Sequence, residues 1–229
     1  MMLSSFPAEN QRLLEPEEIH LRRDEVHVWI VTLSEVPGDF AHSLNKQEWE
    51  RAARFYATRD RNRFVAARSS LREILARYLE AESGSVRFTS GPHGKPALQD
   101  PHCGICFNLS HSGDLMVLAV VQGREVGVDV ERVRDNVEID MLIEQYFTLE
   151  DAKGIQSLPR SRKMAEFFGL WTRTEACLKA SGVGITDGLR ITDRSRWSVH
   201  SFLPAPGYTA ALAVEGGEDF NLSCLSWPR

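Results

Sequence analysis

The chain has 229 residues, of which 42% are hydrophobic and 26% are charged. This composition supplies the core of one large domain or two small ones, and it excludes a disordered chain. No apolar run approaches the roughly eighteen residues that a membrane-spanning helix needs, and the net charge of −5 argues against a nucleic-acid binder.

The N-terminal segment lacks the basic and apolar stretches of a secretory signal, which predicts a cytoplasmic protein. Residues 26–32 are rich in β-branched side chains and are predicted to form a strand. Between residues 64 and 79, apolar side chains recur every three or four positions. This spacing predicts a long helix, which Gly84 is expected to end.

Basic residues are concentrated between positions 46 and 72. The segment holds eight basic and three acidic residues, a local excess of +5: Lys46, Arg51, Arg54, Arg59, Arg61, Arg63, Arg68 and Arg72 against Glu48, Glu50 and Asp60. Such a concentration on an acidic chain favours a polyanionic ligand or an acidic partner surface. The alternative is a solvated helical face, which is the better interpretation for any single arginine.

Turn signals mark the middle of the chain. Three prolines and two glycines between residues 90 and 101 predict a loop that holds Lys95 in extended backbone. Cys103 and Cys106 form a C-x-x-C pair without the further ligands of a structural zinc site. We therefore interpret them as incidental thiols, with metal or redox use as the alternative.

Two predicted strands and a second cycle of elements follow. The strands cover residues 105–109 and 115–121, around a turn at 112–114. After a polar break at 123–125, the expected order is a strand, helices and two strands, at 126–131, from about 140 to 181, near 197–202 and at 208–214. Both halves share this order, which predicts an α/β (α+β) fold. We expect a pseudo-symmetric pair of subdomains, 1–122 and 123–229, with the active site between them.

Two carboxylates project from one face of the strand at 126–131. Its sequence alternates valine with glycine or an acidic residue, so that Gly127, Asp129 and Glu131 share a face. Such a pair suits Mg²⁺, which binds through one or two carboxylates together with waters and substrate phosphates. The alternative is a half-buried strand with a solvated charged face.

Polar signals also occur on a helix and at a strand end. Glu175 and Lys179 lie four residues apart on one helix face, with Trp171 one turn earlier. An ordinary surface ion pair gives the same pattern. The strand that begins at Ile105 runs into Ser110 and His111, although a lone histidine at a strand end is commonly a hydrogen-bonded turn residue.

Together these segments resemble the 4'-phosphopantetheinyl transferases of the surfactin-synthetase-activating (Sfp) type. Four motifs carry the resemblance, in this order: Gly94-Lys95-Pro96; Phe107-Asn108-Leu109-Ser110-His111-Ser112; Gly127-Val128-Asp129-Val130-Glu131; and Trp171-Thr172 with Glu175-Ala176 and Lys179-Ala180. The G-x-D-x-E strand followed by W-T-x-x-E-A-x-x-K is highly specific. The resemblance implies an Mg²⁺-dependent enzyme that transfers phosphopantetheine from coenzyme A to a serine of an apo carrier protein and releases 3',5'-ADP.

The resemblance also implies roles for single residues. Asp129, Glu131 and Glu175 correspond to carboxylates that hold Mg²⁺, and Glu175 and Lys179 to catalytic residues. Those expected to bind coenzyme A are Arg51, Arg63, Lys95, Ser110, His111 and Lys179. Glu175, or a metal-bound water that it activates, takes the serine proton, and Lys179 stabilises or protonates the leaving 3',5'-ADP.

Two positions depart from the family pattern. Thr174 stands where many members have lysine, which puts one phosphate contact in doubt. Glu48 stands where some members have a basic residue near the 3'-phosphate, so nearby arginines are expected to share that task. The alternatives are an Mg²⁺-dependent phosphoesterase, which would ordinarily need more carboxylates for two metals, and a catalytically silent carrier-protein or nucleotide-binding module.

The implied partner is an acyl, polyketide or peptidyl carrier protein, and the sequence leaves the choice among them open. Because such carriers are acidic near the acceptor serine and this chain is acidic too, an apolar contact is expected to support docking. We assign it to residues 141–147, where one or two of five large side chains are expected to be exposed and the others to be core. Arg132 and Arg134 would steer the encounter. Two similar halves in one chain predict a monomer.

Overall fold

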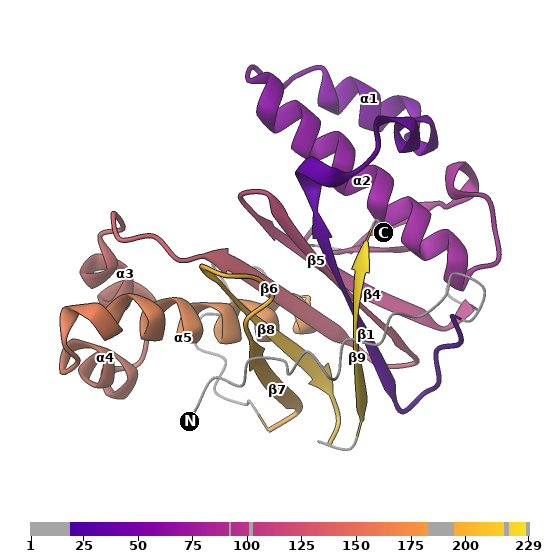
Figure 1. Cartoon of the computed structure of the whole chain (residues 1–229). Helices are drawn as coiled ribbons and strands as arrows, with labels where there is room; N and C mark the ends of the chain where they lie inside the picture. The colour runs from indigo at the N-terminus through magenta and orange to yellow at the C-terminus, as the bar shows by residue number, and fades with distance from the viewer. Residues whose placement is uncertain (1–18, 92, 101–102, 183–194, 218–219, 228–229) are drawn as a thin grey trace.

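The computed structural model describes residues 19–91, 93–100, 103–182, 195–217 and 220–227 (Figure 1). In these ranges the chain forms two main sheets, a short hairpin and several helices, which confirms the predicted α+β fold. None of the helices described is long and apolar enough to cross a membrane.

The first sheet contains four strands and is covered on its outer face by a long helix. Its strand order is β4 (Ile105–Ser112), β5 (Leu115–Gln122), β1 (Glu25–Thr32) and β9 (Asn221–Trp227). The pairs are antiparallel except β1 with β9, which is parallel. Helix α2 (Thr58–Tyr78) buries Leu71, Ile74 and Leu75 against Trp29 and Leu118 of the sheet. The apolar stripe predicted for this helix is therefore its core face.

The second sheet contains three strands and is covered by the helix that carries the last motif. Its order is β6 (Val126–Arg132), β8 (Tyr208–Glu215) and β7 (Trp197–Phe202). Helix α5 (Arg160–Ser181) packs small residues against it, so that Ala176 and Ala180 meet Ala211 and Ala213. Gly182, with a φ of +69°, ends α5 because glycine adopts the left-handed conformation without steric cost.

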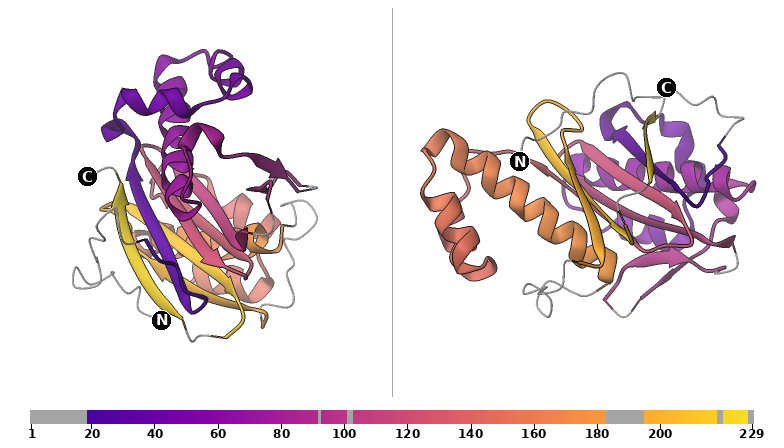
Figure 2. Two further views of the ribbon diagram at one scale, coloured as in Figure 1. Left: turned by 90° about the vertical axis from the view of Figure 1, so that its right-hand side faces the viewer. Right: turned by 90° about the horizontal axis from the view of Figure 1, so that it is seen from below.

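The two sheets pack face to face and share a core. Val28 and Val117 of the first sheet pack in one cluster with Val128 and Leu212 of the second. The edge strands β4 and β6 lie side by side where the sheets meet. Helices α1 (Lys46–Ala52) and α2 lie beyond the first sheet, and α3 (Ile139–Tyr146) and α4 (Leu149–Gln156) extend from α5 at the opposite end of the molecule (Figures 1 and 2). This arrangement confirms the predicted pair of subdomains.

Two local predictions differ from the structure, and one strand was not expected. Helix α2 ends at Tyr78, with Glu80 at a φ of +49°, and Gly84 lies later, in a 3-10 turn (Ser83–Ser85). The predicted loop contains the strand β3 (Pro96–Leu98), which pairs with β2 (Phe88–Ser90). The unexpected strand is β9. It comes after the strands of the second sheet in the chain, but it pairs with β1 in the first sheet. The division of the chain at residue 122 stays a prediction.

Candidate active site

The acidic face of β6 lies directly under helix α5. The valines of β6 point into the core between the sheets, as the alternation predicts, and Gly127, Asp129 and Glu131 take the other face. A Cβ on Gly127 would lie 2.0 Å from the carbonyl oxygen of Ala176 and 2.3 Å from the amide nitrogen of Ala180. Only glycine allows the helix backbone to approach so closely, and this approach brings the motif of α5 next to the two strand carboxylates.

Lys179 connects three elements at the centre of the site. Its Nζ donates to Asp129 Oδ1 over 2.7 Å and to Ser110 Oγ over 2.9 Å, and Ser110 Oγ donates to the same Asp129 oxygen over 2.8 Å. Asp129 is buried, with 3% of its surface exposed. The predicted residues Ser110, Asp129 and Lys179, from β4, β6 and α5, are therefore in direct contact.

Two buried carboxylate oxygens of the site have no hydrogen-bond partner in the part of the chain that the structure describes. They are Asp129 Oδ2 and Glu175 Oε1. Burial, together with the neighbouring charges of Asp129 and Glu131, raises the pKa of Glu175 to about 7, against the lowering effect of Lys179. Burial and the charge of Asp129 also raise the pKa of Glu131, against the hydrogen bond from Ser112. An additional cation would relieve this repulsion.

The donor set fits a hard divalent cation, but the described residues do not form a closed ligand cluster. No group of three or more His, Cys, Asp or Glu side chains in these ranges is arranged to hold a metal. The Lys179 ammonium donates to one Asp129 oxygen, and the other has no hydrogen-bond partner in the described ranges. Oxygen ligands of this kind, completed by water and substrate phosphate, are the ones that Mg²⁺ uses in phosphate sites.

A group of cations lies beside the carboxylates around His111. Partial burial and the positive charges of Lys179, Arg63 and Arg51 lower the pKa of His111. Arg63 Nε also donates to Asp114 over 2.7 Å, and the guanidinium of Arg51 lies 5.3 Å from the ring centre of Phe64. The structure therefore brings these predicted coenzyme A ligands around one imidazole, where an anion would be attracted.

Lys95 lies at the C-terminal end of α5. Its Nζ donates to Glu125 over 2.7 Å and to the carbonyl oxygen of Ala180 over 2.9 Å. A cation is favourable there because the final carbonyl groups of a helix carry partial negative charge. Lys95 thus links the β2–β3 hairpin to the residue that follows Lys179.

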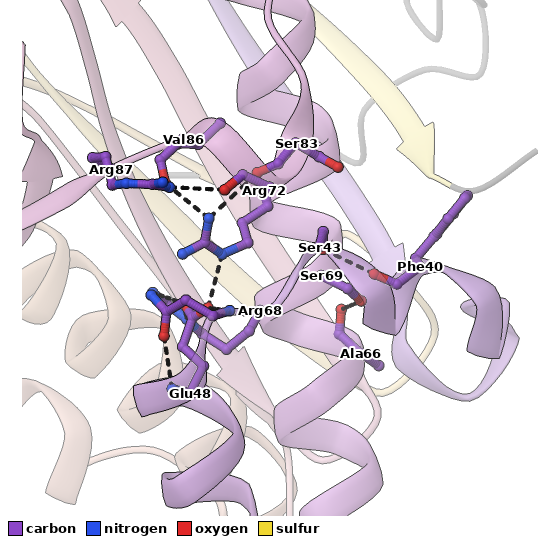
Figure 3. Close-up of polar contacts among 12 residues, drawn as sticks. Phe40, Ser43, Glu48, Ala66, Arg68, Ser69, Arg72, Ser83, Val86 and Arg87 are labelled. Atoms are coloured by element: carbon purple, nitrogen blue, oxygen red, sulfur yellow. Dashed lines mark hydrogen bonds and ion pairs between the residues drawn. The ribbon is translucent and has the colours of Figure 1, made fainter.

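Glu48 belongs to a buried ion-pair network and not to an exposed phosphate site (Figure 3). Its carboxylate accepts hydrogen bonds from Arg68 Nη2 over 2.6 Å and from Arg72 Nε over 2.8 Å. Arg72 is fully buried and also donates to the carbonyl oxygen of Val86 over 2.8 Å. Together with Asn45, Glu48 forms the capping box of helix α1 (Lys46–Ala52). Two of the nearby arginines are therefore engaged by Glu48.

The remaining motif residues have structural contacts. Thr174 is buried, and its hydroxyl donates to the carbonyl oxygen of Leu170 in the preceding turn. Trp171 packs against Tyr146 and Phe167, which fixes α3 against the first half of α5. The four cysteines are thiols that form no disulfide among the described residues, and Cys103 donates to the carbonyl oxygen of Asp100.

No role was predicted for Asn108 and Ser112, although both lie in the motif at residues 107–112. Asn108 Oδ1 accepts a hydrogen bond from the Val128 amide over 2.9 Å, and Ser112 Oγ donates to Glu131 Oε2 over 2.8 Å. Their spacing in the sequence could have indicated a role, because Asn108, Ser110 and Ser112 are two residues apart and therefore lie on one face of β4.

Buried carboxylates facing a group of cations are typical of enzymes that act on phosphate groups. The comparisons with known proteins define the reaction. Residues 29–123 match the family model described as 4'-phosphopantetheinyl transferase, N-terminal, and residues 125–217 match the 4'-phosphopantetheinyl transferase superfamily.

Individual relatives agree. The chain is 36% identical to the 4'-phosphopantetheinyl transferase HetI of Nostoc sp., over 89% of this chain and 93% of the relative. It is 33% identical to psf-1 of Bacillus pumilus, over 69% and 70%, and 24% identical to Sfp of Bacillus subtilis, over 64% of each.

The chain belongs to the 4'-phosphopantetheinyl transferase family. It is an enzyme that transfers phosphopantetheine from coenzyme A to a carrier protein.

Proposed function

We propose that this transferase uses Mg²⁺ bound by Asp129, Glu131 and Glu175. The observation that carries the proposal is a pair of buried oxygens, Asp129 Oδ2 and Glu175 Oε1, that have no hydrogen-bond partner among the described residues. They lie beside Lys179, which contacts Asp129 through Oδ1. When bound, the ion would neutralise charge on the pyrophosphate of coenzyme A. Glu131 completes the set from the same face of β6.

The cations around His111 are proposed to bind the phosphates of coenzyme A. Arg51, Arg63 and Lys179 are close enough to lower the pKa of His111, so a phosphate placed among them would meet several positive charges. Ser110 supplies a hydroxyl at the same place. Lys95 would act at the nucleotide end by exchanging its contact with Glu125, half of whose side chain is exposed, for a phosphate oxygen.

Glu175 and Lys179 are proposed to move the protons of the reaction. The attacking group is the hydroxyl of the carrier serine, and the bond that breaks joins the phosphopantetheinyl phosphorus to the leaving 3',5'-ADP. Glu175, which is ionised when the cation is bound, accepts the serine proton directly or through a water molecule. Lys179, beside Asp129, stabilises or protonates the departing phosphate.

The carrier protein is proposed to dock on helix α3. Met141 is 74% exposed, whereas Ile143 of the same helix is fully buried in the cluster around Phe167. This difference agrees with the expectation that one or two side chains of the segment are exposed and the rest are core. An exposed methionine adapts to an apolar helix of the partner, and Arg132 and Arg134 lie nearby in the chain to steer an acidic carrier.

Further proposals concern the whole molecule. We infer a monomer that works in the cytoplasm and divides into a coenzyme A-binding subdomain, residues 1–122, and a metal-binding subdomain, residues 123–229. A complete set of motifs from β4, β6 and α5 within one chain supports the monomer. Sedimentation at micromolar concentration would test it.

A transfer assay by mass spectrometry tests the proposed site. Incubation with apo carrier protein, coenzyme A and Mg²⁺ should add one phosphopantetheine to the carrier. Asp129→Ala and Glu175→Ala should lower kcat by about 10²- to 10⁴-fold, with unchanged circular dichroism. Glu166→Gln, also on α5 and largely exposed, is the matched control. Wild-type rates for either site variant would refute the assignment. Hydrolysis of coenzyme A with no carrier product would indicate a phosphoesterase.

A further inference from the structure

Alternate side chains of β4 join the two sheets at the active site. β4 and β6 belong to different sheets, and side chains of β4 supply three hydrogen-bonded links between them. Asn108 accepts from the Val128 amide, Ser110 donates to Asp129, and Ser112 donates to Glu131. The three partners follow the order of the strand, so each link fixes a different part of β6.

Ser112 also makes a second contact with β6. Its Oγ donates to Glu131 Oε2 over 2.8 Å and accepts the backbone N–H of Arg132 over 3.1 Å. The amide contact orients the hydroxyl, which is left with its proton to give to the carboxylate. A glutamate has several rotatable bonds, and fixing such a side chain costs rotamer entropy. A hydroxyl that holds one carboxylate oxygen in advance supplies part of that ordering.

Ser110 and Ser112 each donate one hydrogen bond to a carboxylate of β6. Each serine donates to one oxygen of the acid that faces it, and for Asp129 the second oxygen has no hydrogen-bond partner in the described chain. A carboxylate held by one oxygen presents the other in a fixed direction. Asn108 differs, because the hydrogen bond that it makes to β6 in the described residues is to the backbone amide of Val128.

We propose that Ser112 is a positioning residue that orients Glu131 for the divalent cation. The proposal rests on the cation site proposed above, because it requires Glu131 to be a ligand. Hydrogen bonds to metal-binding carboxylates typically contribute a factor of about 10 to 100 in metal affinity. Ser112 touches neither the cation nor the substrate in this account, and it acts through Glu131 alone.

Direct binding of Mn²⁺, followed by the electron paramagnetic resonance signal of the free ion, measures the effect without catalysis. Ser112→Ala should weaken Mn²⁺ binding about 10- to 100-fold, whereas Ser112→Thr, which keeps the hydroxyl, should bind within about threefold of wild type. Ser112→Cys keeps the size of the side chain with a much weaker donor and should resemble Ser112→Ala. Urea unfolding identifies the variants that fold. If either Ser112→Ala or Ser112→Cys folds, comparison of its Mn²⁺ affinity with that of Ser112→Thr tests the role of the hydroxyl.

Asn108→Ala is the matched control, because it removes a link between the same strands without touching a carboxylate. It should lower the free energy of unfolding and leave Mn²⁺ affinity within about threefold. Equal affinity of Ser112→Ala and wild type would overturn the proposal, as would equal weakening by Asn108→Ala. Glu131→Gln separates this proposal from the one on which it rests. If that variant binds Mn²⁺ like wild type, Glu131 is not a ligand and the proposed cation site itself is wrong.

Discussion

Ionisation of Glu175 should destabilise the metal-free enzyme as the pH rises. The pKa of this buried carboxyl lies at about 7 in the folded protein, against 4.5 for an unperturbed glutamate. Between these values the folded protein keeps a proton that the unfolded chain releases, so folding is favoured at low pH and loses that advantage as the pH passes 7. Since one pKa unit corresponds to about 1.4 kcal/mol, the difference amounts to about 3 kcal/mol.

Urea unfolding in EDTA between pH 5 and 8 measures this effect. The free energy of unfolding of wild type, minus that of Glu175→Gln, should fall by about 2.5 kcal/mol across the range, because glutamine does not titrate and part of the change lies below pH 5. Saturating Mg²⁺ should abolish the fall by stabilising the ionised carboxylates. Glu166→Gln, an exposed change on the same helix, should follow wild type at every pH.

Parallel pH dependence of wild type and Glu175→Gln in EDTA would refute this reasoning. It would mean that water or a shift of α5 relieves the repulsion among Glu175, Asp129 and Glu131. A fall that Mg²⁺ does not change would retain the buried acid but would contradict its proposed role as a metal ligand.

Three further predictions follow from the same geometry. Gly127→Ala places a Cβ 2.0 Å from a backbone oxygen of α5 and should lower the free energy of unfolding by about 3 kcal/mol; Gly154→Ala, with open space around it, should not, and equal urea midpoints would contradict the close approach. His111→Ala and Lys95→Ala should raise KM for coenzyme A more than KM for 3'-dephospho-coenzyme A. Equal increases in KM for both substrates would mean that these residues do not bind the 3'-phosphate. Met141→Glu and moderate salt should each raise KM for the carrier protein but not for coenzyme A; a carrier KM that changes with neither would place docking elsewhere.

The strand and helix that carry the motifs could be predicted because each has a simple periodicity. Alternating valines in β6 require the acidic residues to share the opposite face, and the spacing of Glu175 and Lys179 requires one helix face. Both expectations are local, and the structure confirms the shared face of β6. The resemblance supplied the order of the motifs, which periodicity alone does not.

Long-range contacts were harder to predict from the sequence. The sequence of β9 has no pattern that identifies its partner strand. Its parallel pairing with β1 joins two segments almost 200 residues apart in the chain. Glu48 looked like a missing phosphate ligand because the sequence does not show that Arg68 and Arg72 approach it from α2. Such contacts depend on how elements distant in the sequence pack.

The position of the site where the sheets meet connects stability with activity. Lys179 comes from α5, Asp129 from β6 and Ser110 from β4, so their contacts exist only when both sheets and the helix are docked. The same docking buries Glu175 and brings the carboxylates close enough to repel one another, and both effects raise the pKa of Glu175. The apolar core between the sheets therefore has to offset this repulsion until a cation binds. A bound cation, in turn, should stabilise the docked arrangement by mass action.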